Sequence, residues 1–309
     1  MREVPFTFLR GFTMGAADVV PGVSGGTVAL VFGIYHRLIE AIRTGSRALG
    51  RLLKFDVSGG VALLREVEWT FLLPLLAGVL TAVAALSGVV EHLLDNNPVE
   101  MAGLFLGLVA GSVVVAWQLL DRRDTLRVVV LVAVSLATFV LLGLRKGTSE
   151  ESVNQIDDPA LWAFFLAGAV AICAMILPGI SGSFILVTLG MYGSVLGAVN
   201  DRDLLAVGAV ALGCVVGLAL FSQVLHWALS HHYSTVMAAL IGLMVGSLRV
   251  LWPWPAGVDS TALQAPSAPV VLPLLLALGG FVGVVAFDFV GKKFEHRTAT
   301  DEADELRSV

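Results

Sequence analysis

Residues 19–35 read VVPGVSGGTVALVFGIY and residues 176–192 read ILPGISGSFILVTLGMY, so the same Pro-Gly-x-Ser-Gly core occurs twice. Both copies lie inside strongly apolar stretches. Pro lacks an amide hydrogen and clashes with the preceding helical turn, and Gly is a weak helix former. We therefore interpret each copy as a break between two helical arms, and we expect two broken hairpins, at residues 5–36 and 161–199.

The composition is that of a polytopic membrane protein. Of the 309 residues, 57% are hydrophobic and only 14% are charged, with a mean hydropathy of +0.89. Soluble proteins are nearer a quarter charged. Nothing in the charge pattern indicates nucleic acid binding. Cys173 and Cys214 both lie in apolar stretches, without a spacing typical of disulfides or metal ligands, so we expect neither a metal site nor a cofactor.

Six further stretches are long and apolar enough to cross a bilayer, at roughly 20 residues each. They are residues 70–92, 99–119, 127–143, 204–228, 236–252 and 269–290. Several glycines in them recur at a spacing of four residues, which is typical of closely packed membrane helices. The sequence therefore predicts an all-α membrane protein in which each broken hairpin is followed by three transmembrane helices.

The two hairpins align without a gap, and ten positions between residues 8 and 35 are identical in the second copy. Pro178, for example, lies 157 positions after Pro21. Five further identities follow at a shorter spacing, because Gly213 lies 135 positions after Gly78. Self-similarity of this kind indicates an internal duplication. The predicted repeats are residues 1–144 and 161–290, with a tail at 291–309.

The topology predicts that the second repeat is inverted. A hairpin enters and leaves the membrane on one side, so each repeat makes three net crossings, and three is odd. The positive-inside rule tests the orientation independently. With the N-terminus in the cytoplasm, fifteen Lys and Arg residues fall inside and four outside. We expect a multi-pass protein of the cytoplasmic (inner) membrane with both termini cytoplasmic.

Residues 37–68 alternate basic and apolar residues at helical spacing. This pattern is typical of a helix lying on the inner membrane surface, where anionic lipid favours Lys and Arg. An ordinary cytoplasmic linker helix is the alternative.

The motifs could bind an anion. After each break a new helix begins, and its first N–H groups lack partners within the helix. The residues expected to contact a phosphate are small or carry a hydroxyl; they are Ser24, Gly25, Gly26, Thr27, Ser181, Gly182 and Ser183. The residues expected to form the turns are Pro21, Gly22, Pro178 and Gly179. The alternative is that each motif only kinks a helix and aids packing; two matched copies favour the binding loop.

One carboxylate breaks the symmetry of the repeats. Asp18 lies three residues before Pro21, whereas Met175 occupies the equivalent position in the second copy. A carboxylate inside the membrane is costly, which favours a functional role in proton transfer or in orienting a basic residue. A structural cap or an ion pair with Arg10 is the alternative. Arg10 itself could bind a phosphate or extend to the membrane interface.

The segment MGAADVVPGVSGGTVALVFGIY, paired with LPGISGSFILVTLGMY, resembles the bacterial and archaeal polyprenyl-phosphate transporter family, formerly a domain of unknown function. The resemblance covers nearly the whole chain. It implies translocation of undecaprenyl phosphate, or an archaeal equivalent, from the outer to the inner leaflet for reuse as a glycan carrier. The positions that match the family motif are Asp18, Pro21, Gly22, Ser24, Gly25, Gly26, Thr27, Pro178, Gly179, Ser181, Gly182 and Ser183.

Moving a negative charge inward against an inside-negative potential costs roughly 2.3 kcal/mol per charge per 100 mV. Transport in that direction is therefore expected to be coupled to protons or other cations, with Asp18 as the leading candidate. A transporter or channel for a small soluble anion is one alternative. An integral lipid phosphatase is another, but the sequence lacks the clustered acids or the nucleophile with His and Arg partners that it would need. Homo-oligomerisation stays open.

Overall fold

The computed structural model describes residues 3–20, 23–144, 156, 159–257 and 261–307, and the side chains among them from residue 4 to residue 289. All regular secondary structure in this described part is helical, as the sequence predicts. In chain order the α-helices are α1 (Glu3–Asp18), α2 (Gly25–Val31), α3 (Tyr35–Leu53), α4 (Val57–Glu66), α5 (Trp69–Asn96), α6 (Pro98–Gln118), α7 (Thr125–Gly143), α8 (Leu161–Ile176), α9 (Gly182–Thr188), α10 (Tyr192–Asn200), α11 (Leu204–Ser247) and α12 (Val271–Arg307). A short 3-10 helix, η2, covers Leu248–Leu251.

Five helices in the described residues are long and apolar enough to cross a membrane, and the pair α9 and α10, bent by 110°, could supply a sixth crossing. The sequence predicts six spans outside the hairpins because it divides α11 into two. At 44 residues, α11 would be about 66 Å long, roughly twice the hydrocarbon core. Its backbone leaves helical geometry at His232, with φ −136° and ψ 39°. The break falls between the two predicted spans, and the chain is a multi-pass membrane protein.

The first helix of each hairpin packs closely on the helix that follows that hairpin. α1 lies against α5, and α8 lies against the first half of α11. A Cβ added at Gly11 would meet the carbonyl oxygen of Leu75, and one added at Gly168 would meet that of Val210. Both members of the second contact follow from the first at the two offsets of the sequence repeat. The duplication thus extends from residue identities to helix contacts.

The last helices of the two halves are exchanged. α6, from the first half, packs most extensively on α12, and the second half of α11 packs on α7. A Cβ at Gly107 would meet the Ala277 carbonyl, and a Cβ at Gly242 would meet the Leu131 carbonyl. The glycines predicted to face other helices do so. Each half therefore contributes a helix to the other, and neither half buries its own surfaces alone.

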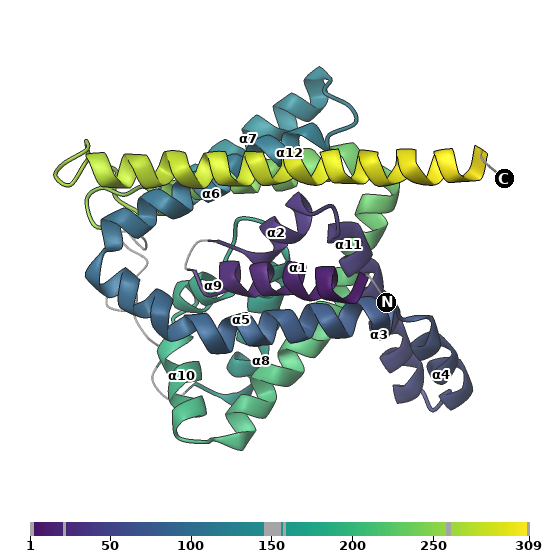
Figure 1. Cartoon of the computed structure of the whole chain (residues 1–309). Coiled ribbons are helices and arrows are strands. Elements are labelled where there is room, and N and C mark those ends of the chain that lie inside the picture. Colours follow the sequence, from purple (N-terminus) through teal and green to yellow (C-terminus); the bar gives the residue numbers. More distant parts are fainter. Residues whose placement is uncertain (1–2, 21–22, 145–155, 157–158, 258–260, 308–309) are drawn as a thin grey trace.

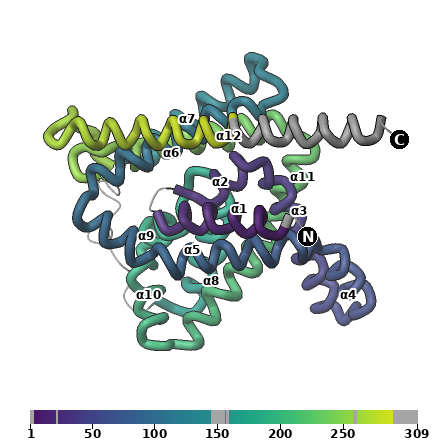
Figure 2. Tube along the Cα trace, viewed as in Figure 1, coloured from purple at the N-terminus to yellow at the C-terminus, as the bar shows by residue number. Residues whose placement is uncertain are grey.

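Two equivalent helices of the repeats lie at opposite ends of the molecule (Figures 1 and 2). α3, with α4 beside it, lies at one end of the molecule, and α10, which begins at Tyr192, the repeat equivalent of Tyr35 in α3, lies at the other end. The inversion of the two halves stays a prediction. The sides of the membrane that these ends face stay a prediction.

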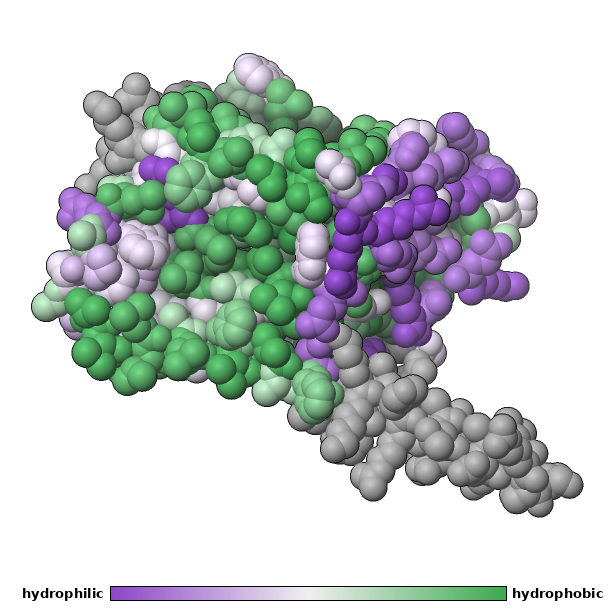
Figure 3. All heavy atoms as spheres, turned by 90° about the horizontal axis from the view of Figure 1, so that it is seen from above, coloured by the Kyte–Doolittle hydropathy of each residue, from purple (hydrophilic) through white to green (hydrophobic). Residues whose placement is uncertain are grey.

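Hydrophobic side chains cover most of the face seen in Figure 3, and hydrophilic ones gather at the end where α3 and α4 lie. The exposed apolar residues include Leu136 on α7 and Leu275 and Leu278 on α12, each about 60% exposed. A contiguous apolar surface of this extent is typical of a membrane-embedded body.

Candidate functional site

Both hairpins break at the motif. α1 ends at Asp18 and α2 begins at Gly25, while α8 ends at Ile176 and α9 begins at Gly182. Ser24 and Ser181 are the N-cap residues of the two short helices. Gly179 has φ +85°, a left-handed conformation that glycine adopts without steric cost. Pro21 and Gly22, the turn residues predicted for the first copy, lie outside the described residues.

The first motif packs on the C-terminal end of α8, whose last carbonyl groups have no partner within that helix. Ser24 is buried, and its hydroxyl lies 3.0 Å from the Met175 carbonyl oxygen and 3.3 Å from that of Leu177. The Tyr35 hydroxyl donates to the Ile176 carbonyl at 3.2 Å. Two hydroxyl groups of the first hairpin thus complete the end of the helix that opens the second.

The first motif also contacts the second motif directly. The amide of Gly179 donates to the buried Thr27 hydroxyl at 3.1 Å. A Cβ at Gly26 would lie 2.5 Å from the Ile176 carbonyl oxygen, so only glycine allows this approach. The hydroxyl of Ser24 also accepts a hydrogen bond from the Gly26 amide at 3.1 Å. The structure therefore brings the two motifs together, and the hydroxyls of Ser24 and Thr27 join them.

A cleft of about 320 Å³ lies beside this junction, between the end of α1, α8, α9 and α11. Its polar lining comes from Asp18, Ser181, Gly182 and Ser183, and the hydroxyls of Ser181 and Ser183 are 2.7 Å apart. The rest of its lining is mainly apolar; it includes Val23, Ile172, Met175, Leu186 and Val210. A polar group at one wall and an apolar remainder suit an amphipathic ligand.

Asp18 connects the cleft to the first motif. Its Oδ1 accepts a hydrogen bond from the Gly25 amide at 2.6 Å. A Cβ at Gly25 would lie 2.5 Å from Oδ2 of the same carboxylate, so the approach requires glycine. The carboxylate thus occupies the place beside α2 where the sequence predicts a bound phosphate.

Arg10 does not join this group. Eight residues separate it from Asp18 on α1, which is about 12 Å along the helix axis, and none of the ion pairs between described residues links the two. The structure therefore does not support a structural pair between these residues.

Of the residues predicted to contact a phosphate, Ser181, Gly182 and Ser183 line the cleft together with Asp18, whereas Ser24, Gly25, Gly26 and Thr27 lie at the junction behind it. The sequence did not predict the contribution of α11, Val210 and Cys214. Position 210 is the repeat equivalent of Leu75, which lies against Gly11. The repeat offsets were the signal that could have placed this helix beside α8.

Two comparisons with known proteins agree with each other. A family model described as undecaprenyl phosphate translocase-like matches residues 14–267. A polyprenyl-phosphate transporter of Vibrio cholerae serotype O1 is 39% identical over 248 residues, covering 80% of this chain and 77% of the relative. A polyprenyl-phosphate transporter of Staphylococcus aureus is 31% identical over 255 residues, covering 79% of this chain and 85% of the relative. No solved structure matches the chain significantly. The descriptions name transport rather than an enzymatic reaction, in agreement with the sequence prediction.

Proposed function

Because the chain belongs to the undecaprenyl phosphate translocase-like family, we propose that it transports polyprenyl phosphate across the membrane, with the cleft beside the two motifs as the headgroup site. The observation that carries this proposal is the cleft itself. It places two hydroxyls and one carboxylate against an apolar wall, inside a body whose surface is hydrophobic. The transporters named above supply the class of lipid.

The headgroup would bind at Ser181 and Ser183. Their hydroxyls now share one short contact. A phosphate oxygen placed between them would accept a hydrogen bond from each, because a hydroxyl rotates freely to suit its acceptor. Ile172, Leu186 and Val210 would then contact the first units of the polyprenyl chain.

Asp18 makes this binding dependent on a positive charge. Its carboxylate lines the same cleft, and two negative groups in one small cleft repel each other strongly where little water screens them. Binding of the phosphate would therefore require a proton or another cation at Asp18. This requirement would couple entry of the lipid to entry of the cation.

The proposed direction is from the outer to the inner leaflet of the cytoplasmic membrane, with both chain termini in the cytoplasm and the two repeats inverted. In this direction an inside-negative potential opposes the phosphate, and a co-transported cation removes the opposition. The transported carrier would be reused for cell-envelope glycan synthesis.

A reconstituted transport assay tests the function. Liposomes containing the protein should move polyprenyl phosphate between leaflets faster than empty liposomes, and should move its diphosphate and inorganic phosphate little. Equal transport of inorganic phosphate would support a small-anion transporter instead. Release of inorganic phosphate from the lipid would indicate a phosphatase.

The native cysteines test the location of the site. Cys214 lines the cleft and Cys173 does not, although both side chains are partly buried. Polyprenyl phosphate at about ten times its Kd should slow maleimide labelling of Cys214 about tenfold, because only the free fraction reacts. Labelling of Cys173, measured in the same sample by mass spectrometry, should not change. Equal protection of both cysteines, or of neither, would place the ligand elsewhere.

A further inference from the structure

The helices α3 and α4 form a hairpin at the hydrophilic end of the molecule (Figures 1 and 3). The two helices pack on each other, and α3 also packs on α11. The connection between them is only three residues long, Lys54 to Asp56. The segment predicted from sequence as one surface region is therefore a tight helical corner.

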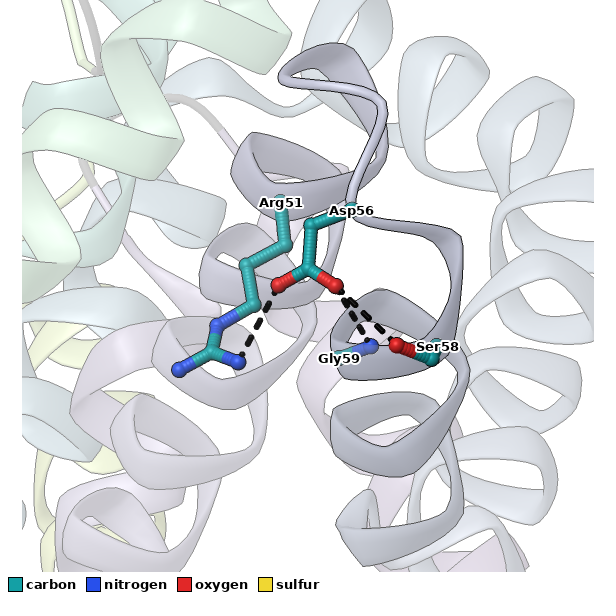
Figure 4. A network of polar contacts seen from close by, with 4 residues as sticks. All are labelled: Arg51, Asp56, Ser58 and Gly59. Carbon is teal, nitrogen blue, oxygen red and sulfur yellow. Dashed lines mark hydrogen bonds and ion pairs between the residues drawn. The ribbon is translucent and has the colours of Figure 1, made fainter.

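A carboxylate fixes the conformation of this corner (Figure 4). Asp56 accepts hydrogen bonds from the Gly59 amide at 2.9 Å and the Ser58 hydroxyl at 3.2 Å, and its other oxygen lies 3.3 Å from Arg51 Nη1. The bond from the Gly59 amide, with smaller contributions from Ser58 and Arg51, holds the pKa of Asp56 below its usual value. The carboxylate therefore stays ionised at neutral pH, and its three contacts hold the corner in one conformation.

The corner presents apolar side chains outward. Leu53 is 73% exposed, Phe55 is 92% exposed and Val57 is 61% exposed. Phe55 also has φ +60°, a left-handed conformation that is sterically unfavourable for a bulky residue. The conformation belongs to the cap of α3, because the Phe55 amide donates to the Leu52 carbonyl and the Asp56 amide donates to the Arg51 carbonyl, each at 3.0 Å. Packing within the chain does not explain the exposure. Three adjacent exposed apolar side chains at a fixed corner indicate a surface that contacts a partner or a membrane.

The surroundings of the corner are basic. Residues 35–66 contain six Lys or Arg and three Asp or Glu, a net charge of +3, whereas the whole chain carries −5. Arg47, Arg51, Lys54 and Arg65 are exposed. Their partner should be anionic.

From these observations we infer that the α3–α4 corner is an anchor for anionic phospholipid, with Leu53, Phe55 and Val57 inserted at the membrane interface. The hairpin is continuous with the membrane-embedded body, because α3 begins at the buried Tyr35, so a lipid surface lies within its reach. Exposed basic side chains around an apolar tip are the pattern that interfacial segments use. A second copy of the chain fits less well, because it would bring two surfaces of charge +3 together. This inference does not depend on the transported substrate.

Site-directed spin labelling tests the anchor. Cys173→Ser and Cys214→Ser remove the native thiols, and Phe55→Cys then carries a nitroxide label. In vesicles containing phosphatidylglycerol, the label should be severalfold less accessible to the water-soluble relaxant Ni(EDDA), and more accessible to oxygen, than a label at Asp201→Cys. Asp201 is exposed in the turn between α10 and α11 and serves as the matched control.

The charge dependence supplies the second measurement. In phosphatidylcholine vesicles, or after Arg47→Gln with Lys54→Gln, the label at position 55 should regain access to Ni(EDDA); Arg51 is kept because it supports Asp56. Equal access at positions 55 and 201 in anionic vesicles would overturn the inference. Equal protection of the label at position 55 in anionic and in phosphatidylcholine vesicles would also overturn it. Protection that disappears when the labelled protein is diluted with unlabelled protein would overturn it too, because it would indicate contact between two copies.

Discussion

Asp18→Asn is expected to abolish the pH dependence of polyprenyl-phosphate transport while retaining binding of the lipid. The amide oxygen of Asn can still accept the hydrogen bond from the Gly25 amide, which now measures 2.6 Å to the carboxylate, so the local geometry is preserved. The charge is lost, and with it the group proposed to carry the cation. Without one coupled charge, the steady-state ratio of inner to outer lipid should fall about 50-fold at 100 mV, since 2.3 kcal/mol corresponds to that factor.

Two further variants separate charge from geometry in this test. Asp18→Ala removes both the charge and the acceptor for Gly25, so it should also weaken the contact between the end of α1 and the start of α2 and lower thermal stability. Asp18→Glu keeps the charge but displaces it, and should retain pH dependence at a reduced rate. Transport and lipid binding are measured in proteoliposomes across a pH series with an imposed potential. An active Asp18→Asn protein with an unchanged pH profile would exclude Asp18 as the coupling group.

Gly107→Ala is expected to destabilise the folded protein strongly. Its Cβ would overlap with the Ala277 carbonyl oxygen and lie 2.6 Å from the Ala277 carbonyl carbon. Backbone atoms cannot move aside as a flexible side chain can, so α6 and α12 would have to separate. We expect a loss of about 3 kcal/mol in stability, at the upper end of overpacking effects. Size-exclusion chromatography in detergent should show aggregate in place of a monodisperse peak.

The chain offers matched controls for this substitution. Gly279 lies on α12, the helix that Gly107 of α6 contacts. Nothing is within 4 Å of a Cβ added at Gly279, so Gly279→Ala should be tolerated. Gly242→Ala tests the other exchanged pair, because its Cβ would lie 2.7 Å from the Leu131 carbonyl oxygen. It should be destabilising as well. Equal yields of folded Gly107→Ala and Gly279→Ala would show that the α6–α12 contact is not required.

Much of the fold could be predicted because its signals are local. Apolar runs of about 20 residues predict spans, and Pro-Gly-Ser within such a run predicts a break, whatever the rest of the chain does. The repeat offsets extend these signals, since Gly11 and Gly168 contact equivalent helices. The predicted division of α11 at residues 229–235 agrees with the break at His232.

The candidate site was predicted less completely, because a hydroxyl does not reveal its partner in the sequence. Ser24 and Thr27 match the residues expected to bind phosphate, yet they contact Met175 and Gly179, about 150 residues away. Ser24 bonds to the unpaired carbonyls at the end of α8, and these carbonyls come near Ser24 only after the helices pack.

By itself, then, the sequence determined the helical class, the two breaks, the duplication and the lone carboxylate, because each follows from residue type and spacing alone. Only the tertiary structure decided that α7 and α12 each pack on the other half, that the first motif supports the second, and that Asp18 shares a cleft with α8, α9 and α11. These features arise from close contacts between distant segments. Such contacts depend on which backbone groups remain unpaired and which surfaces fit, and neither is encoded in any short stretch of the chain.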